Sequence, residues 1–227
     1  QIISQSDRNY LDALIRYAKA LENRNAMLKH GVRDAILFES VEEQLCTSAA
    51  YIHGVRENWI EEFTPIFMDY YHAITDGEET VSLEYRSHLH EMSMSQNLGE
   101  TRDVDAAVGF TTRGVHRDDI ELMLGDYAMR KIGSQGQCKT YTIALRLAQF
   151  DFLKQTCGIT PLLLLDDIFD KLDSRRVRNI IDVVSGNRGE GFGQIFITDT
   201  NRTHLDEIIS SVGSDYRIFH VEEGAIG

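Results

Sequence analysis

Two adjacent acidic residues, Asp166 and Asp167, follow the four-leucine run Leu162–Leu165. Such a run is typical of a strand buried on both faces of a parallel sheet, and a buried strand fixes the position of the residues after it. Ligand sites in α/β sheets lie at the carboxyl ends of the strands. There Asp166 can hold Mg²⁺ beside nucleotide phosphates, and Asp167 can orient or deprotonate an attacking water. In the alternative interpretation, the two acids cap a loop or a helix.

A glycine-rich turn, Gly133–Gln137, precedes the segment Lys139–Lys154, which is apolar nearly all round and which we predict to be a buried helix. The free backbone N–H groups at a helix start and the helix dipole together favour an anion such as phosphate. Ser134 and the two glutamines of the turn add side-chain hydrogen bonds. Alternatively, Ser134 is an ordinary N-cap.

The same turn comes close to a second phosphate-binding pattern. Residues 133–140 read G-S-Q-G-Q-C-K-T, one residue away from the P-loop pattern G-x-x-x-x-G-K-[ST]. Cys138 stands where the second glycine belongs, and a Cβ there obstructs the turn that wraps the phosphates. The preceding segment, residues 127–132, can form a strand, so its context is compatible with the pattern. A self-contained phosphotransferase that uses residues 133–140 therefore stays open as an alternative.

Two more polar positions follow along the chain, of which Thr198 falls at the same predicted sheet edge. The segment Phe169–Ser174 contains Asp173, which either caps the following helix or belongs to the site. Thr198 ends the next predicted strand, where its hydroxyl can reach a γ-phosphate or the attacking water. The order of these features along the chain predicts one half of a nucleotide site. They are a phosphate-type turn, a buried helix, a strand with paired acids, a loop that contains an aspartate, and a strand with a polar end.

These residues need a layered α/β framework to position them. We predict a second buried strand at Gln194–Thr198, parallel to the leucine run, and an amphipathic helix from Val177 to Val184, closed by Gly186, between the two. The other predicted elements are strands at Val81–Tyr85, Gly109–Thr112 and Tyr216–Val221, a β-hairpin over Ile120–Ile132, and a turn at residues 222–224.

The first eighty residues carry the period of amphipathic helices. Ser6 or Asp7 can cap a first helix, Gly31 separates it from a second, and Pro65 should kink or end the second. An aromatic cluster and the turn Asp76-Gly77 follow, and we place a domain boundary there. We expect a helical hairpin or small bundle over residues 1–78 and an α/β lobe over residues 79–227. The apolar stripes are Leu11, Leu14, Ile15, Ala18 and Leu21 in the first helix and Ile36, Leu37, Val41, Leu45, Ile52, Trp59, Ile60 and Phe63 in the second.

The composition limits the classes of function. The chain of 227 residues has a formal net charge of −13, and neither predicted domain is basic, which argues against non-specific nucleic-acid binding by bulk charge. Three cysteines are too few and too scattered for a disulfide framework or a zinc site. No apolar run is long enough to span a bilayer, and the start of the chain does not resemble a signal peptide. We therefore expect a cytoplasmic protein without membrane contact.

The order of these motifs resembles the ATP-binding-cassette (ABC) type ATPases, and most closely the RecF family of bacterial DNA-repair proteins. Ser134–Gln137 is similar to the signature motif, Leu162–Asp167 to Walker B, and Phe169–Asp173 to the D-loop. Two further stretches are similar to that family: Gly114–Asp119, which has valine in place of a proline, and Tyr10–Leu28, which is like the start of its helical arm.

The resemblance implies a role for each candidate residue. Asp166 would hold Mg²⁺, Asp167 would be the catalytic carboxylate, and Thr198 would occupy the switch position, where many relatives have histidine. For His116 and Arg117, a structural role is at least as well supported as a functional one. The residues that would bind ATP in trans, from across a homodimer, are Ser134, Gln135, Gly136, Gln137 and Asp173.

The implied fold is α/β, the C-terminal half of an ABC-type P-loop ATPase lobe with a helical arm subdomain. The implied function is ATP-dependent DNA binding in recombinational repair and replication-gap processing. ATP and Mg²⁺ would drive homodimerisation, single- and double-stranded DNA at gaps would be bound, and the partners RecR and RecO would help to load a recombinase.

The largest departure from that family is the absence of a Walker A motif from the 227 residues. In the family it precedes the helical arm, so the chain resembles the carboxyl part. We expect the whole protein to be a weak ATPase and this chain alone to be inactive. A further alternative is a helical protein-interaction module in which the ATPase fold is a relic.

Overall fold

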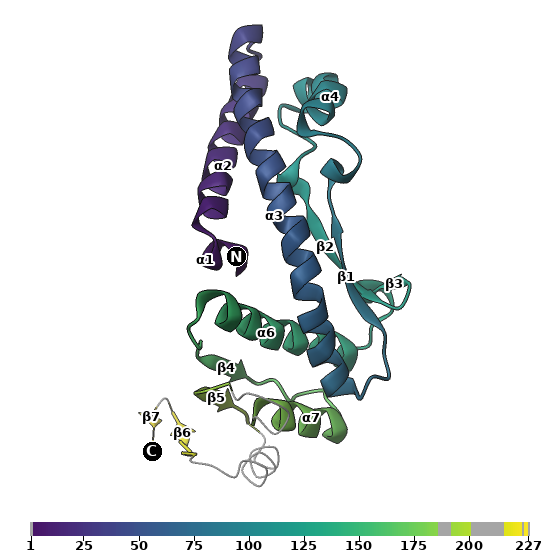
Figure 1. The fold of residues 1–227 in the computed structure, drawn as a ribbon, viewed down its shortest axis with the longest axis vertical. Coiled ribbons are helices and arrows are strands. Elements are labelled where there is room, and N and C mark those ends of the chain that lie inside the picture. Colours follow the sequence, from purple (N-terminus) through teal and green to yellow (C-terminus); the bar gives the residue numbers. More distant parts are fainter. Residues whose placement is uncertain (1, 186–191, 201–215, 224, 227) are drawn as a thin grey trace. The chain divides into compact units, whose positions relative to one another are not determined.

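The computed structural model describes residues 2–185, 192–200, 216–223 and 225–226 (Figure 1). Its contacts divide the chain into two compact units. Unit 1 combines residues 1–66 with 80–132, and unit 2 combines residues 67–79 with 133–227. Helix α3 (Ala35–Thr75) contributes to both. The predicted domains 1–78 and 79–227 are different segments from these units, and that division stays a prediction.

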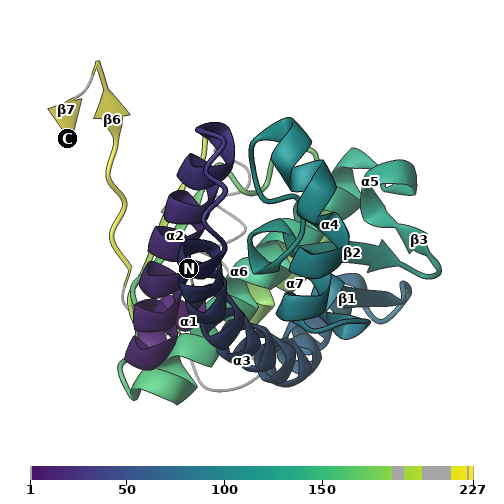
Figure 2. The ribbon, with the colours of Figure 1, turned by 90° about the horizontal axis from the view of Figure 1, so that it is seen from above.

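Unit 1 contains helices and a three-stranded antiparallel sheet of order β1-β2-β3 (Figure 2). Strand β1 pairs with β2 from Val81↔Leu124 to Arg86↔Asp119. The core draws apolar side chains from α2, α3, α4 and η2. Besides the first part of α3, the elements are α1 (Ile2–Ser6), α2 (Arg8–Lys29), β1 (Val81–Arg86), η1 (His88–His90), α4 (Met94–Val108), η2 (Val115–Arg117), β2 (Asp119–Leu124), β3 (Tyr127–Ala128) and α5 (Met129–Ile132).

The apolar stripe predicted for the first helix is confirmed only in part, because Leu14 and Leu21 pack against the core but are only partly buried. Helix α2 instead buries the face that lies one residue earlier, which carries Tyr10, Tyr17 and Arg24, while Leu11 and Ile15 are exposed, the latter to 58%. One residue corresponds to a rotation of about 100° around the helix axis. The pattern of leucines and isoleucines misses this face because its large members are two tyrosines and an arginine, which find polar partners in the interior.

Arg24 is the centre of a buried polar network. Its Nε lies 2.9 Å from Oε1 of Glu42, and its Nη1 donates to Oδ2 of Asp105 and to Oγ1 of Thr111, both at 2.8 Å. The other carboxylate oxygen of Asp105 accepts from the backbone N–H and the hydroxyl of Thr112, at 2.9 and 2.7 Å. A buried charge is tolerated when it is paired and hydrogen-bonded in this way. The network therefore joins α2, α3 and α4.

The start of α2 and the break between α2 and α3 follow the sequence prediction, whereas the cap of α3 was not predicted. Asp7 caps α2, and its carboxylate accepts from the N–H of Tyr10 at 3.0 Å. Gly31, with a φ of +64°, lies in the turn that separates α2 from α3. Asp34 precedes α3, and its carboxylate accepts from the N–H of Ile36 at 3.0 Å. In each case a short polar residue satisfies free N–H groups of the first turn.

The second predicted stripe is confirmed in the middle of α3 but not at its start. Ile52 and Phe63 are fully buried, whereas Ile36 is exposed. Pro65 lies inside the helix, which continues to Thr75, so the prediction that it could end the helix is wrong. Proline removes one backbone hydrogen bond. The burial of Phe63 just before it offsets this loss, because packing outweighs propensity in a helix of a folded protein.

Helix α4 was not predicted, and the strand predicted at Gly109–Thr112 is absent from the described structure. Gly109, with a φ of +79°, ends α4 in the left-handed conformation. Ser93 and Gln96 form a capping box at the other end. The segment after Gly109 is held by side-chain bonds to Thr111 and Thr112 rather than by a strand ladder.

The predicted hairpin at Ile120–Ile132 is confirmed in its first part. Strand β2 pairs with β3, and Gly125 has a φ of +57° in the connecting turn. Strand β3 has two residues, after which the chain forms α5. The last four residues of the predicted hairpin, Met129–Ile132, are therefore helical.

Unit 2 contains the strands and helices that carry the candidate site. Strands β4 and β5 are parallel, with a register from Leu163↔Ile195 to Asp166↔Thr198. The aromatic side chains at the end of α3 pack against α6: the ring centroid of Tyr141 lies 4.6 Å from that of Phe67 and 5.5 Å from that of Tyr71. Besides the end of α3, the elements are α6 (Gln135–Cys157), β4 (Leu163–Asp166), α7 (Ser174–Val184), β5 (Ile195–Thr198), β6 (Val221–Glu222) and β7 (Ala225–Ile226).

The strands of unit 2 differ from the prediction in their burial. Leu163 and Leu165 are buried, but Leu164 is 69% exposed, and Phe196 of β5 is exposed as well. The predicted burial on both faces is therefore wrong for the described structure. A run of identical leucines carries no polar alternation, so it cannot distinguish one covered face from two.

The last predicted strand, Tyr216–Val221, is wrong over most of its length. Residues 216–220 are exposed and form no strand, and pairing begins at Val221, where β6 and β7 make a short hairpin. Glu223, with a φ of +49°, lies in the predicted turn. Gly224 and Gly186, which we predicted at a turn and a helix end, lie outside the described residues.

The three cysteines are free thiols. None of the helices in the described residues combines the length and the apolar character needed to cross a bilayer.

Candidate nucleotide-binding site

Strands β4 and β5 end next to each other, and both last residues are polar. Asp166 faces Thr198 in the parallel ladder, and the hydroxyl of Thr198 donates a hydrogen bond to Oδ1 of Asp166. The N–H of Asp167 donates to the carbonyl oxygen of Thr198 at 3.1 Å. All three side chains are exposed. The structure therefore brings together the three residues that the sequence placed at this edge.

Asp167 leaves the strand in an unusual backbone conformation. Its φ of +46° is in the left-handed region, which disfavours L-residues but which aspartate tolerates better than most. Its carbonyl oxygen accepts from Nζ of Lys139 at 2.8 Å. Within the described residues, neither carboxylate of the Asp166–Asp167 pair forms an ion pair with a lysine or arginine. Carboxylate oxygens in this arrangement are suitable ligands for a hard divalent cation.

The start of α6 forms a capping box. The hydroxyl oxygen of Ser134 accepts from the N–H of Gln137 at 3.2 Å, and Oε1 of Gln137 accepts from the N–H of Ser134 at 2.8 Å. The N-cap interpretation of Ser134 is therefore confirmed in this structure. The side chains of Ser134 and Gln135 are exposed. The dipole of this 23-residue helix leaves partial positive charge at its exposed start, which suits an anion.

The P-loop interpretation of residues 133–140 is wrong. Cys138 already lies inside α6, and Gly133 and Ser134 alone connect α6 to α5, which is a helix rather than a strand. No extended turn is left to wrap phosphates. The ammonium group of Lys139 instead donates to the backbone of Asp167.

The segment between β4 and α7 lies against the start of α6. Asp173 caps α7, and its Oδ1 accepts from the N–H of Arg176 at 2.9 Å. A Cβ on Gly136 would lie 3.3 Å from the carbonyl oxygen of Lys171, which itself has a φ of +62°. Nη1 of Arg176 donates to Oγ1 of Thr140 at 3.2 Å. The predicted signature and D-loop segments are thus neighbours within unit 2.

The sequence analysis missed Glu79, whose carboxylate connects three helices. Its Oε1 accepts from Nη2 of Arg176 at 2.7 Å and from Nε2 of Gln137 at 3.2 Å, and its Oε2 accepts from the hydroxyl of Tyr71. Burial and this hydrogen bond raise the pKa of Tyr71 well above its ordinary value. Locally, Glu79 is one acid in an acidic stretch, and its partners lie 58 and 97 positions away. No local signal could have identified it.

No family model matches the chain. It is 50% identical over 226 residues to the DNA replication and repair protein RecF of Bacteroides thetaiotaomicron, and 49% identical over 227 residues to that of Porphyromonas gingivalis. These matches cover 99% and 100% of this chain and 60% and 62% of the relatives. The chain thus spans about three fifths of the length of these curated relatives.

Two solved structures also match, described as the recombination mediator protein RecF-ATPrS and RecF-ATP in the RecFOR pathway. Their TM-scores are 0.76 and 0.75, at 27% and 26% identity. They match 99% and 100% of this chain, and it covers 60% of each. These matches confirm the family resemblance and the predicted fold, an α/β half of an ABC-type ATPase lobe with a helical arm.

Proposed function

We propose that this chain, a homologue of the RecF proteins over nearly its whole length, forms part of an ATP-dependent DNA-binding protein of replication and repair. The relatives are named for replication and repair, and the chain spans 60% of the first of them. The observation that carries the proposal is the exposed carboxylate pair at the end of β4 next to Thr198 at the end of β5. This is the edge of an α/β sheet where nucleotide ligands bind.

ATP and Mg²⁺ are the ligands that we assign to this edge. Asp166 holds Mg²⁺, Asp167 orients or deprotonates the attacking water, and Thr198 contacts the γ-phosphate or that water. One of the matched structures is described as an ATP complex, which supports the choice of nucleotide. The 227 residues contain no Walker A motif to cradle the β- and γ-phosphates, so we expect the chain alone to bind ATP weakly and not to hydrolyse it.

We assign the start of α6 to ATP that is bound to a second copy of the protein. Residues 134–137, of which Ser134 and Gln135 are exposed, bind the γ-phosphate in trans at the positive end of the helix dipole, and Asp173 acts across the same interface. Contacts from both protomers to the negatively charged phosphates of ATP then hold the dimer together, and hydrolysis of ATP releases the protomers. ATP is in this respect a switch for dimerisation.

The DNA and protein partners follow from the relatives. We propose that the whole protein binds single- and double-stranded DNA at gaps and works with RecR and RecO to load a recombinase. The two matched structures are described as recombination mediators of the RecFOR pathway, which supports this assignment. Because this chain has a net charge of −13, we place the basic DNA-facing residues mainly in the part of the relatives that it does not span.

A full-length protein of the relatives' size that carries this chain tests the proposal. Asp167→Asn should abolish Mg²⁺-ATP hydrolysis and repair function while ATP binding is retained. Asp126→Asn is the matched control, because Asp126 is an exposed acid in the turn between β2 and β3 and lies outside the candidate site. If Asp167→Asn hydrolyses ATP and supports repair as well as the control does, the acid pair has no catalytic role. The helical interaction module would then be the better interpretation.

A further inference from the structure

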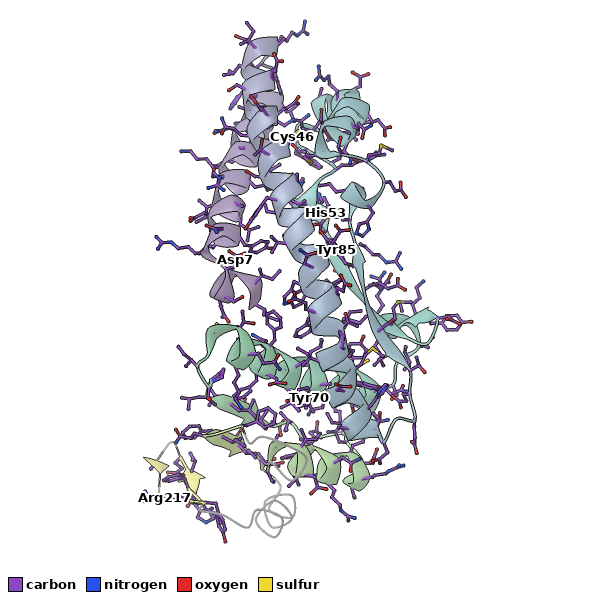
Figure 3. All side chains as sticks on the ribbon, viewed as in Figure 1. Asp7, Cys46, His53, Tyr70, Tyr85 and Arg217 are labelled. Atoms are coloured by element: carbon purple, nitrogen blue, oxygen red, sulfur yellow. The ribbon has the colours of Figure 1, made fainter. Side chains whose placement is uncertain are left out.

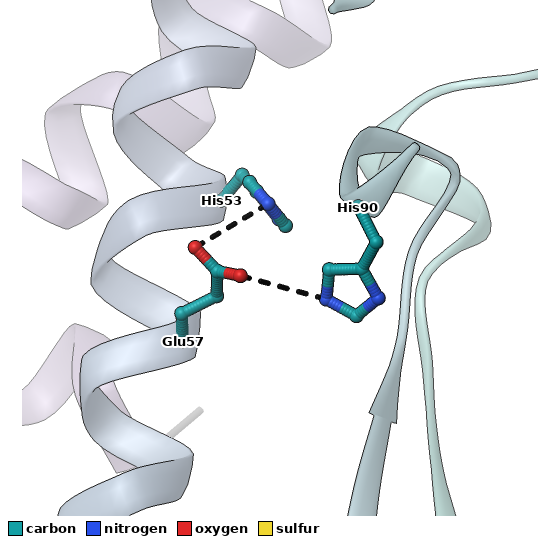
Figure 4. Close-up of side chains that lie close together, drawn as sticks. All are labelled: His53, Glu57 and His90. Carbon is teal, nitrogen blue, oxygen red and sulfur yellow. Dashed lines mark ion pairs between the residues drawn. The ribbon is translucent and has the colours of Figure 1, made fainter. Parts of the chain in front are cut away.

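Three side chains in unit 1 form a cluster that the nucleotide site does not use (Figure 4). His53 and Glu57 lie one turn apart on α3, and His90 is the last residue of η1. One ligand atom of each residue lies within 4.8 Å of those of the other two. Two imidazoles and a carboxylate are a common ligand set for zinc and related metal ions.

The two distances between histidine and carboxylate in this cluster, each to a different oxygen of Glu57, are close to those of an occupied site. Nε2 of His53 lies 3.4 Å from Oε2 of Glu57, and Nε2 of His90 lies 3.7 Å from Oε1 of Glu57. In a tetrahedral zinc site with bonds of about 2.0–2.1 Å, neighbouring ligand atoms are about 3.3 Å apart. Glu57 and His90 are both exposed, so rotation of their side chains can bring one carboxylate oxygen and both imidazoles around one ion.

A hydrogen bond on the far side of His53 fixes which of its nitrogens is free. His53 and Tyr85 are neighbours (Figure 3). The hydroxyl of Tyr85 donates to Oδ2 of Asp118 at 2.5 Å, so its oxygen accepts from Nδ1 of His53 at 3.2 Å. With its proton on Nδ1, neutral His53 directs the lone pair of Nε2 toward the carboxylate of Glu57. Two electron-pair donors then face each other, an arrangement that a cation between them stabilises. Metal-binding histidines are oriented by such partners.

Asp118 holds this orienting partner in place. Its side chain is 4% exposed, and its Oδ2 accepts from Nη1 of Arg56 at 2.5 Å as well as from Tyr85. Its Oδ1 is buried and has no hydrogen-bond partner within the described residues. Arg56 also donates to the carbonyl oxygen of Val115 at 2.7 Å. Tyr85 is thus fixed by a network that belongs to the scaffold and does not depend on a bound ion.

We propose that His53, Glu57 and His90 form a binding site for a divalent transition-metal ion, of which Zn²⁺ is the best fit. The two nitrogen ligands favour Zn²⁺ over Mg²⁺ and Ca²⁺, which prefer oxygen ligands. Three protein ligands leave a fourth position for water. The bound ion ties η1 to α3. The small number of cysteines argued against a zinc site with cysteine ligands. It does not exclude the site proposed here, because the three ligands are two histidines and a glutamate.

The proposal stands apart from the nucleotide site and is tested on the 227-residue chain. Zn²⁺ is titrated in competition with a chelating indicator, and wild type is compared with Glu57→Gln and His90→Gln. His88→Gln is the matched control, because His88 lies in the same 3₁₀ turn but outside the cluster. We expect one competitive site in wild type and in the control, and affinity weaker by about tenfold or more in the two cluster variants.

Co²⁺ identifies the ligand type in the same proteins. A site of two histidines and a carboxylate gives visible d–d absorption without a thiolate charge-transfer band, and both cluster variants should lose it. Circular dichroism of the metal-free variants shows that they are folded; should His90→Gln fail this check, Glu57→Gln decides, since Glu57 is exposed. Absence of competition by wild type, a thiolate band, or equal affinity in His88→Gln and the cluster variants each overturns the proposal.

Discussion

Two groups of charged side chains, Arg24 with Asp105 in unit 1 and Asp166 with Asp167 in unit 2, lie in opposite environments. In unit 1, Arg24 is 1% exposed and its partner Asp105 is fully buried, and Nε and Nη1 of Arg24 and both carboxylate oxygens of Asp105 form hydrogen bonds. In unit 2, Asp166 and Asp167 are exposed at a strand end, and the described hydrogen bond to Asp166 comes from the neutral hydroxyl of Thr198.

The difference indicates which charges build the fold and which are available for chemistry. A buried ion pair that loses one member leaves an uncompensated charge, so its residues are fixed by stability. An exposed carboxylate contributes little to stability and can be kept for binding a cation. Burial and pairing thus separate the scaffold from the candidate site more clearly than residue type does.

The largest effect is expected from breaking the scaffold pair. Arg24→Ala leaves Asp105 buried without its ion pair and should lower the free energy of unfolding by about 3–5 kcal/mol. Urea unfolding followed by circular dichroism measures this change. Arg102→Ala is the control, since Arg102 is 68% exposed and lies 3.5 Å from the same Glu42; it should change stability by less than about 1 kcal/mol. Equal effects of the two variants would contradict the distinction between scaffold and surface charges.

A second large effect is expected at Gly114. Its φ of +133° is accessible mainly to glycine, and an added Cβ would lie 2.6 Å from the hydroxyl oxygen of Tyr17 and 2.7 Å from Cε of Met94. Gly114→Ala should destabilise the chain by about 1–3 kcal/mol. Gly54→Ala, in open space inside α3, should stabilise it by about 0.5–1 kcal/mol. Thermal unfolding of both variants checks the opposite signs.

Asp166 and Arg24 also show which features of the structure could be predicted from the sequence. The strand end at Asp166 was predictable, because an apolar run followed by acids is a local pattern. The burial of Arg24 was not, because its partners Asp105 and Thr111 lie 81 and 87 positions away. The same holds for Glu79 in unit 2, whose contacts depend on the packing of three helices. Local patterns give elements and strand ends, whereas long-range polar pairing has to be seen in the structure.

A smaller effect concerns the pH dependence of unit 1. Burial lowers the pKa of His116, whose Nε2 donates to the carbonyl oxygen of Thr111 at 3.1 Å while Nδ1 accepts from the hydroxyl of Tyr17 at 2.8 Å. The unfolded chain, with a histidine pKa of about 6.5, binds more protons, so stability should fall as pH drops below about 6.5. His116→Gln should reduce this slope, and the exposed His220→Gln should not. The pH dependence of stability is measured from denaturant midpoints, starting about one pH unit above the histidine pKa and going downward. Equal slopes in all three proteins would contradict the assignment of this dependence to His116.

The smallest effect on stability is expected at the candidate site. Asp166→Asn removes an exposed carboxylate and keeps an acceptor for Thr198, so the free energy of unfolding of the chain should change by less than about 0.5 kcal/mol. Chemical denaturation provides the value. A loss as large as that of Arg24→Ala would show that Asp166 belongs to the scaffold.

The central claim is that the exposed start of α6 binds ATP held by a second copy of the protein. Sedimentation velocity of a full-length protein with Mg²⁺-ATP tests it most directly, with Gln135→Glu compared to Gln155→Glu, the same charge change on the same helix. A glutamate at position 135 suits the helix dipole but repels phosphate, so the fold is kept. The account predicts an ATP-dependent dimer in wild type and in Gln155→Glu and a monomer in Gln135→Glu. An ATP-dependent dimer of undiminished affinity in Gln135→Glu would contradict it.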